Sequence, residues 1–558
     1  MSFLSHRFVA VVLLAGAAVP LHAQTFPTDD PVIKKIWTLG MDQSKTQDLA
    51  HTLFDSLGPR LMGAPNLKAA QDWLVRTYTG WGIEAKNEQY GTWRGWRRGY
   101  SHIDLISPRT RTLEGQMLGY SPGTNKKDLD AVAVILPRFA DSTEFVKWLP
   151  QAKGKLVLVS AGLPTCRPQD DWQVNATPEA KARMDSLMVA TQREWGGRNV
   201  RGTGYSLALG GGELAVRLEE GGAAGVISSR PKLAWRMPNP NAPARAGGGG
   251  GFGGAPNTGW GTMEIFETYT TKVPTIALSC EDYGLVFRLA EKGEQPKLRL
   301  NLDGQLLGEQ PVFNTIAMIR GSEKPDEYVM LSAHFDSWDG SSGATDNGTG
   351  TLTMMEAMRI LKTAYPHPKR TILVGHWSGE EEGEVGSKAF TEDHPDILKG
   401  LQALFNQDNG TGRIVRLGGG GLVHSPEHIN DWLSKLPTEF KAQINFGGAG
   451  RPAGGGSDDF SFGCAGLPAF GLGATSWDYG NVTWHTERDT YDKVVFDDLK
   501  GNATITAMLA YLASEDPERI PLDRVSLQAP ANAAGGRGGS GTWPVCEKAP
   551  RKTEPRLK

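Results

Sequence analysis

From about residue 301, short apolar segments typical of strands alternate with helical segments, and polar motifs follow the strands directly. The pattern predicts strands over 328–335, 371–377, 401–407 and 469–472, and a helix over about 349–363. Alternating strands and helices indicate an α/β fold with a mostly parallel central sheet flanked by helices. Ligands of such sheets bind beyond the carboxyl ends of the strands. The polar motifs after these strands are therefore the candidate functional residues.

The motifs contain two histidines and three acidic residues that could together bind metal ions: His334, Asp346, Glu381, Asp408 and His485. A mixed set of imidazole nitrogens and carboxylate oxygens suits zinc better than calcium or magnesium. Three carboxylates can lie side by side only if cations offset their repulsion. Two Zn²⁺ supply about +4 against about −3, and a bridging hydroxide brings the total near zero, which a partly dry pocket tolerates. The charges therefore favour two zinc ions over one.

Each motif also has a simpler interpretation when it is taken alone. His334 and Asp336 could be a hydrogen-bonded loop pair, or a metal-bound imidazole oriented by a neighbouring carboxylate. Asp346 could cap the following helix. The run 380–382 could be a solvated acidic turn, or one glutamate could bind metal while its neighbour accepts a proton from metal-bound water. His376, on the preceding strand, is interpreted as a core or supporting histidine rather than a ligand.

Five separated blocks occur in an order that resembles metallopeptidase family twenty-eight: HFDSWDGSSGATDNGTG, SGEEEGEVGSKAF, NQDNG, GGGSDDFSF and WHTERDTYD. The resemblance covers roughly residues 300–515 and extends to LGPRLMGAPNLKAAQDWL near the N-terminus. It looks closest to the carboxypeptidase Q-like and bacterial aminopeptidase-like members. It implies a zinc exopeptidase-like fold, in which residues 115–300 resemble an inserted protease-associated domain.

The resemblance also implies a role for each ligand candidate. His334 and Asp408 would hold one zinc ion, Glu381 and His485 would hold the other, and Asp346 would bridge the two.

The same resemblance makes Glu380 the general base and Asp336 the residue that orients His334. Glu382 stands where the family commonly has an uncharged residue, so the acidic run could be aligned in two registers. The downstream Gly383, Gly386 and Ser387 match the family's EE-x-G-x-x-G-S pattern. They place the base at Glu380 and the ligand at Glu381.

The implied activity is hydrolysis of small peptides by an aminopeptidase or dipeptidase with two Zn²⁺. A carboxypeptidase of the same family is the alternative, and it needs a cation for the substrate carboxylate, for which Arg451 and Arg488 are the candidates. The paired acids of residues 457–462 (SDDFSF) suit a substrate ammonium, or form a solvated acidic turn. A receptor-like binding protein that has lost its ligands is disfavoured because all five ligand positions and the base are present.

The N-terminus predicts export. Arg7 precedes a short apolar run, and Leu21-His22-Ala23 resembles a cleavage site, so residues 1–23 are expected to be a signal peptide. The run is shorter than the ~20 residues that span a bilayer, so no stable membrane insertion is expected. Asn347 and Asn409 lie in glycosylation sequons directly after two ligand candidates. A glycan at either position would obstruct the site, which favours a host that does not glycosylate these sequons, as expected of a bacterial periplasmic or extracellular protein.

Composition changes divide the chain. We expect residues 24–114 and 301–515 to form the catalytic domain, residues 115–300 to form a β-rich α+β insert, and residues 516–558 to form a flexible tail. Within the insert, the segment AGGGGGFGG is expected to be a surface loop. A formal net charge of −3 gives no electrostatic reason to expect a nucleic-acid partner. The sequence does not indicate an oligomeric state.

Overall fold

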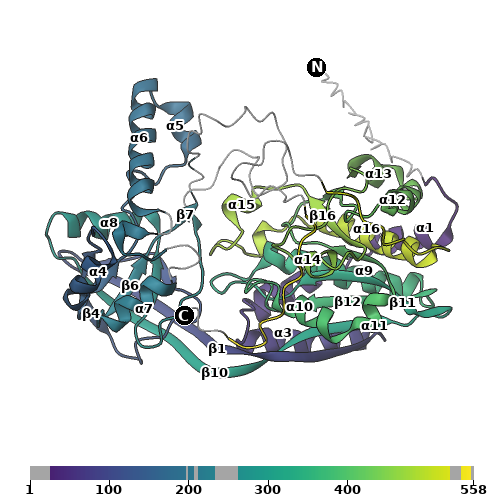
Figure 1. Cartoon of the computed structure of the whole chain (residues 1–558), viewed down its shortest axis with the longest axis horizontal. Coiled ribbons are helices and arrows are strands. Elements are labelled where there is room, and N and C mark those ends of the chain that lie inside the picture. Colours follow the sequence, from purple (N-terminus) through teal and green to yellow (C-terminus); the bar gives the residue numbers. More distant parts are fainter. Residues whose placement is uncertain are drawn as a thin grey trace, which may run out of the picture.

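The computed structural model describes residues 26–196, 199–206, 212–232, 235, 262–527 and 542–553. The predicted leader and the glycine-rich segment 246–254 lie outside these residues. A 14-stranded sheet has the order β15-β14-β16-β13-β11-β12-β10-β4-β5-β6-β9-β3, and β1 pairs with β10 and β2. The strands β1 (Glu84–Ser107) and β10 (Lys297–Ile319) are long and antiparallel, and they run together along the base of the molecule (Figure 1). They connect two halves of one sheet.

The first half is built around the strands that carry the motifs. β11 (Lys324–His334) lies between β12 (Arg370–Trp377) and β13 (Leu401–Asn406), and β16 (Ala469–Ala474) follows β13, all in parallel. Every residue of β12 and β13 is buried, as expected where helices cover both faces of a parallel sheet. β10 and β14 (Ile414–Leu417) join this core antiparallel. The predicted α/β fold is confirmed, although the sheet as a whole is mixed.

Successive residues of β11 point to opposite faces and enter different cores. Val329 and Leu331 pack with α9 (Thr349–Ala364) and α16 (Phe496–Glu515) on one face. Met330 packs on the other face with Phe390 of α10 (Val385–Asp393). This alternation follows from the period of two in a strand. It fixes the direction in which the end of β11 presents its polar residues.

The second half of the sheet is formed by residues that lie between β1 and β10 in the sequence. β4 (Leu129–Ile135), β5 (Leu156–Leu158), β6 (Gly225–Ser228) and β9 (Thr275–Leu278) are parallel, and β3 (Gly115–Met117) closes the edge. α8 (Cys280–Glu291) packs against this half, and α5 (Gln169–Asn175) and α6 (Pro178–Trp195) project from it (Figure 1). It has its own buried core. The division of the chain into domains stays a prediction.

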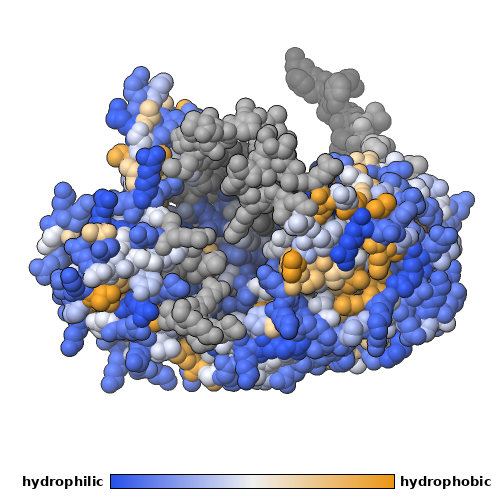
Figure 2. Space-filling view, viewed as in Figure 1, coloured by the Kyte–Doolittle hydropathy of each residue, from blue (hydrophilic) through white to orange (hydrophobic). Residues whose placement is uncertain are grey.

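The other elements are α1 (Pro31–Trp37), α2 (Thr46–Ala50), α3 (Pro65–Gly80), α4 (Ser142–Trp148), α7 (Gly212–Glu220), α11 (Pro395–Lys399), α12 (Ser425–Ser434), α13 (Thr438–Gln443), α14 (Asp459–Gly463), α15 (Tyr479–Val482), β2 (Arg111–Thr112), β7 (Pro231–Lys232), β8 (Thr262–Met263) and β15 (Asn445–Phe446). The face of the molecule in Figure 2 is mainly hydrophilic, with apolar residues gathered in patches. No helix among the described residues is long and apolar enough to cross a membrane.

Two disulfides join the four cysteines, Cys166 to Cys280 and Cys464 to Cys546. The second bond ties residues 542–553 to the first half of the sheet. In the same segment the Trp543 indole N–H donates to the carbonyl of Gly463 at 3.1 Å, and Arg551 pairs with Asp393 at 2.8 Å. The expectation of a flexible tail therefore does not hold for residues 542–553. The misleading signal was composition, because a glycine-rich stretch precedes a segment that is covalently anchored.

Candidate metal centre

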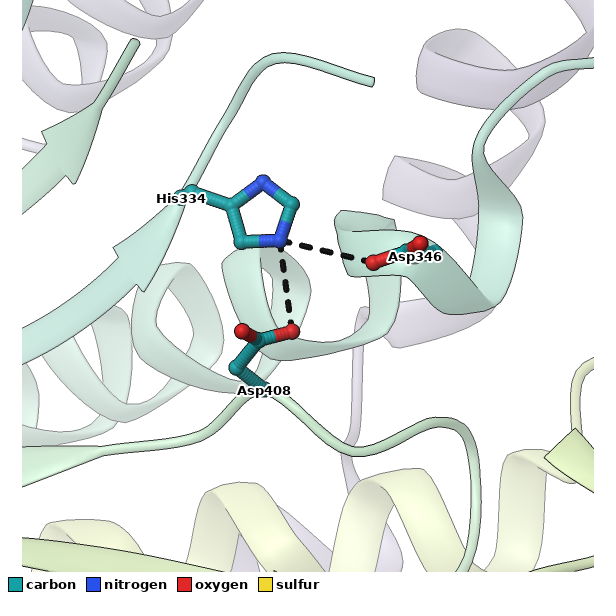
Figure 3. A group of neighbouring side chains, drawn as sticks. All are labelled: His334, Asp346 and Asp408. Atoms are coloured by element: carbon teal, nitrogen blue, oxygen red, sulfur yellow. Dashed lines mark hydrogen bonds and ion pairs between the residues drawn. The ribbon is translucent and has the colours of Figure 1, made fainter. Parts of the chain in front are cut away.

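The five ligand candidates converge at the carboxyl edge of the first half-sheet. His334 ends β11, Glu381 follows β12 and Asp408 follows β13, while Asp346 precedes α9 and His485 follows α15. The ligand-type atoms form two groups, each with all atoms within 4.8 Å of one another: His334, Asp346 and Asp408 in one, and Asp346, Glu381 and His485 in the other. Figure 3 shows the first group. Asp346 belongs to both groups.

The imidazole nitrogens face the carboxylates directly. His334 Nε2 lies 3.2 Å from Asp408 Oδ1 and 3.5 Å from Asp346 Oδ1 (Figure 3). His485 Nε2 lies 2.8 Å from Glu381 Oε2 and 3.4 Å from Asp346 Oδ2. The two oxygens of Asp346 therefore point to different histidines, which is the arrangement a bridging carboxylate requires.

The buried carboxylates change the protonation of the cluster. Burial alone would lower the pKa of His334, but the carboxylates of Asp408 and Glu380 raise it well above its usual value. Burial and the neighbouring charge of Asp346 raise the pKa of Glu381 to about 7, although His485 opposes this shift. Without cations, the cluster thus draws protons onto groups that must lose them to bind a metal.

The chemistry of the residues is compatible with metal binding, since each of the two groups could hold a metal ion. Three buried atoms have no hydrogen-bond partner among the described residues: Asp346 Oδ2, Glu381 Oε1 and His485 Nδ1. Buried carboxylate oxygens without donors are costly unless a cation satisfies them. The donor set is imidazole nitrogen and carboxylate oxygen, which suits zinc.

Asp336 contacts His334 more closely through its backbone carbonyl than through its carboxylate. His334 Nδ1 lies 3.1 Å from the backbone carbonyl of Asp336, and 3.7 Å from its carboxylate. A donated bond to this carbonyl leaves Nε2 free to face the ligand group. The Asp336 carboxylate instead accepts the backbone N–H groups of Glu380, at 3.2 Å, and Glu381, at 3.3 Å. It therefore fixes the acidic turn after β12.

The additional acid in that turn faces away from the two ligand groups. Glu382 accepts a hydrogen bond of 2.9 Å from the Tyr120 hydroxyl, and it neighbours Glu267, which pairs with Arg94. Burial and the charge of Glu267 raise the pKa of Glu382 well above its usual value. Glu382 therefore lies outside both groups of ligand candidates.

Two supporting residues near Asp346 have no role in the sequence-based assignment. Asp489 accepts the backbone N–H groups of Thr345, at 2.7 Å, and Asp346, at 2.9 Å. The Tyr479 hydroxyl is hydrogen-bonded to the Asp346 carboxylate, and its ring lies so close to Gly410 that a Cβ there would come within 3.0 Å of it. Asp489, the first aspartate of WHTERDTYD, and Gly410 of NQDNG were the sequence signals available for these two supporting contacts. Their partners could not be identified from spacing.

Arg60, from the block LGPRLMG, holds the loop between His334 and Asp346. Its guanidinium is fully buried and donates to the carbonyls of Phe335 (2.6 Å), Gly58 (3.1 Å), Ser342 (2.7 Å) and Gly343 (2.9 Å). Burial lowers its pKa to about 10, so it stays charged at neutral pH. The N-terminal block thus holds in place the loop between the ligand candidates His334 and Asp346.

We expect Arg60→Met to lower the free energy of unfolding by about 3 kcal/mol or more, since each buried carbonyl left unpaired costs about 1–3 kcal/mol. Urea unfolding of both proteins at one zinc concentration measures the difference. Arg320→Met is the matched control, because Arg320 pairs with Glu84 at 3.2 Å while both side chains are largely exposed. A loss no larger than that of the control would contradict the structural role of Arg60.

Comparison with known proteins relates the first half of the sheet to a described protein family. Residues 314–510, which include all five ligand candidates, match the family described as Peptidase family M28. We call residues 314–510 the M28 segment, and this segment is similar to peptidases of that family. The M28 segment holds strands β11, β12, β13 and β16, so the family match and the metal centre coincide.

Relatives extend the likeness beyond the M28 segment. Carboxypeptidase Q of Bos taurus is 24% identical over 372 residues, which cover 67% of this chain and 66%, slightly under two thirds, of that protein. Carboxypeptidase Q of Mus musculus is 22% identical over 483 residues, covering 86% of this chain and 88% of its own length. The chain is therefore similar to carboxypeptidase Q over most of its length.

Two solved structures share the fold. An M28 peptidase precursor from Shewanella amazonensis has a TM-score of 0.60 at 23% identity, covering 88% of this chain and 97% of its own. A zinc aminopeptidase from Bacillus subtilis has a TM-score of 0.51 at 17% identity, covering 86% of this chain and 96% of its own. Both alignments extend beyond the M28 segment, because that segment is much shorter than the aligned share of the chain.

Proposed function

We propose that this protein is an exported exopeptidase with two zinc ions that cleaves small peptides from their free amino end, as an aminopeptidase or dipeptidase. The observation that supports it most is the sharing of Asp346 between two ligand groups, with Glu380 Oε2 3.9 Å from His334 Nε2. The M28 relatives support peptide hydrolysis in general. The number of zinc ions and the end of the peptide that is cleaved belong to the proposal.

Each residue of the cluster has a role in this proposal. His334 and Asp408 would hold one zinc ion, Glu381 and His485 would hold the other, and Asp346 would be shared by both. Bound zinc would polarise the scissile carbonyl and make a water molecule more acidic. The Glu380 carboxylate accepts the proton of the attacking water and passes it to the leaving amine. Asp336 keeps Glu380 in place through the backbone N–H of that residue.

Electrostatics favour a substrate ammonium over a substrate carboxylate. Asp458 is fully buried, and neither of its carboxylate oxygens has a hydrogen-bond partner among the described residues. Burial and the charge of Asp408 raise the pKa of the adjacent Asp459 to about 7. An ammonium group placed beside these acids would relieve their repulsion. The paired acids of SDDFSF are thus the proposed neighbours of the substrate amino group.

The structure offers less support for a carboxypeptidase. Arg488 lies 3.3 Å from Glu487 and 3.4 Å from Glu114, and about half of its side chain is exposed. Arg451 is an exposed residue of the loop before α14. A cation already paired with two acids is a weak anchor for a substrate carboxylate.

A panel of peptides tests the proposal. We expect tripeptides with a free amino end to be hydrolysed at least about 100-fold faster than their N-acetylated forms, because a site built around one polar group rejects analogues that lack it. Amidated peptides with a free amino end should remain substrates, and dialysis against a chelator should abolish all turnover. Comparable cleavage of N-acetylated peptides would refute the proposed specificity, and turnover that survives complete zinc removal would refute the proposed chemistry.

Export is proposed on separate grounds. Two disulfides fit an oxidising compartment, and the predicted signal peptide precedes them in the sequence. We also propose that residues 115–300 form an insert in a catalytic domain made of residues 24–114 and 301–515. The boundary at 300/301 lies within β10, and the boundary at 114/115 lies at the start of β3.

A further inference from the structure

Residues 264–265, which lie between β1 and β10 in the sequence, contact the loop that carries His485. The backbone N–H of Ile265 donates to the carbonyl of His485 at 2.9 Å, and Glu264 forms an antiparallel bridge with Thr486. Residues 262–263 form β8, which pairs with β7. The small β7–β8 sheet, although it comes from between β1 and β10 in the sequence, therefore abuts one of the proposed metal ligands.

Lys232 of β7 contacts this loop with its ammonium group. Its side chain is almost completely buried, and Nζ donates to the backbone carbonyls of Gly480, at 3.2 Å, and Trp484. Glu264 Oε1 is 3.8 Å away and offsets part of its charge. The two carbonyls that accept from Lys232 lie at the start and the end of the segment that leads into His485.

The same ammonium group lies over an aromatic ring. Lys232 Nζ is 4.4 Å from the centre of the Trp484 ring, within the range of a cation–π contact. The Trp484 ring in turn stacks on the His485 imidazole, with ring centres 4.0 Å apart and planes 27° apart. Ammonium, indole and imidazole thus form a chain of contacts from β7 to the ligand.

Orientation of His485 explains the presence of a lysine at position 232 better than packing does. An apolar residue would fill the same volume at position 232 without the cost of burying an ammonium group. The Lys232 ammonium restrains the loop by donating to two backbone carbonyls, and it restrains the Trp484 indole by a cation–π contact. Together these contacts limit the directions in which His485 Nε2 can point. Residues that orient a metal-binding imidazole are a recurrent feature of zinc sites.

We propose that Lys232 is a positioning residue for His485. The β7–β8 sheet would thereby affect how tightly the zinc ion at Glu381 and His485 is held. The proposal rests on the ligand role of His485 in the proposed function. It implies that the metal centre, although its ligands all lie in the M28 segment, is completed by a residue from outside that segment.

Zinc retention in the presence of a chelator tests this role without measuring activity. Wild type and Lys232→Met are dialysed against graded chelator concentrations, and zinc per chain is measured in each. We expect Lys232→Met to lose one of its two zinc ions at a chelator concentration about 10-fold lower than wild type, the lower end of the usual effect of such supporting residues. The other zinc ion should leave both proteins at the same concentration.

Lys181→Met is the matched control, because Lys181 pairs with Asp185 at 2.7 Å on α6. It removes one lysine charge from the same region of the sequence and should leave both zinc transitions unchanged. Lys232→Arg keeps the charge and should recover part of the lost retention. Equal zinc retention in wild type and Lys232→Met would overturn the proposal, whereas a wild type that binds no zinc would refute the proposed function instead.

Trp484→Phe decides the question if Lys232→Met does not fold, as judged by thermal unfolding of the zinc-free proteins. This change keeps the backbone carbonyl that accepts from Lys232 but shrinks the ring between the ammonium and the imidazole. We expect earlier loss of one zinc ion from this variant too. Zinc retention equal to that of wild type would overturn the proposal in that case.

Discussion

Glu380→Gln is expected to bind two zinc ions and to lose most of its peptidase activity. Glutamine has nearly the same shape as glutamate but cannot accept the proton of the attacking water. General-base groups contribute about 10²–10⁴-fold to the rate, so kcat should fall by that factor. The backbone N–H of residue 380 would still donate to Asp336, so the turn that holds Glu381 should keep its conformation.

The measurement pairs zinc content with kcat on one peptide that has a free amino end. Glu382→Gln is the matched control, because this glutamate lies two residues along the same turn but contacts Tyr120 and Glu267 instead of the metal ligands. The control should keep most of its activity. If Glu380→Gln retained near-normal turnover with its zinc in place, the assignment of the general base would be wrong.

The elements that carry the centre could be predicted from sequence because each has a strong local signal. The strand expected over 371–377 is β12 (Arg370–Trp377), and the helix expected over 349–363 is α9 (Thr349–Ala364). Once parallel strands were expected, their carboxyl ends had to meet at one edge of the sheet. The convergence of His334, Glu381 and Asp408 follows from that topology.

The long strand β1 shows where local signals fail. The local sequence pattern is typical of a strand over residues 83–90 only, whereas β1 runs over Glu84–Ser107. Glycine and arginine interrupt the alternation in WRGWRRGY, and the pairing of β1 with β10 shifts register at four places. The strand is extended because β10 supplies hydrogen-bond partners along its length, and that pairing joins residues about 200 positions apart. No window of sequence contains this information.

Supporting contacts of the ligands were missed for a related reason. Asp336 was expected to orient His334 with its carboxylate because alternation along a strand points both side chains to the same face, and because the family resemblance implies this role. In the structure its carboxylate reaches across to the next strand and accepts the N–H groups of Glu380 and Glu381. Lys232 contacts Trp484 from the separate β7–β8 sheet. Ligand candidates can be predicted from motif order, but their supporting contacts come from the packing of segments that are distant in sequence.

Asp346→Ala is expected to have the largest effect on metal content of any single substitution in the centre. Asp346 is the one residue common to both ligand groups, and its two oxygens face different histidines. Its removal leaves two ligand candidates in each group, too few for a tight zinc site. Zinc should fall below one ion per chain after dialysis into metal-free buffer, and kcat should fall by at least about 1,000-fold, since metal ions contribute several kcal/mol to such reactions.

His485→Ala is the graded comparison for this variant. It removes a ligand candidate from one group only, so the group of His334, Asp346 and Asp408 should still retain one zinc ion. The two variants must therefore differ in zinc content, and the variant that removes the shared residue must retain less. Two zinc ions bound to Asp346→Ala would rule out a bridging carboxylate. Equal losses in both variants would mean that the two ions bind only together, so that no single group holds zinc without the other.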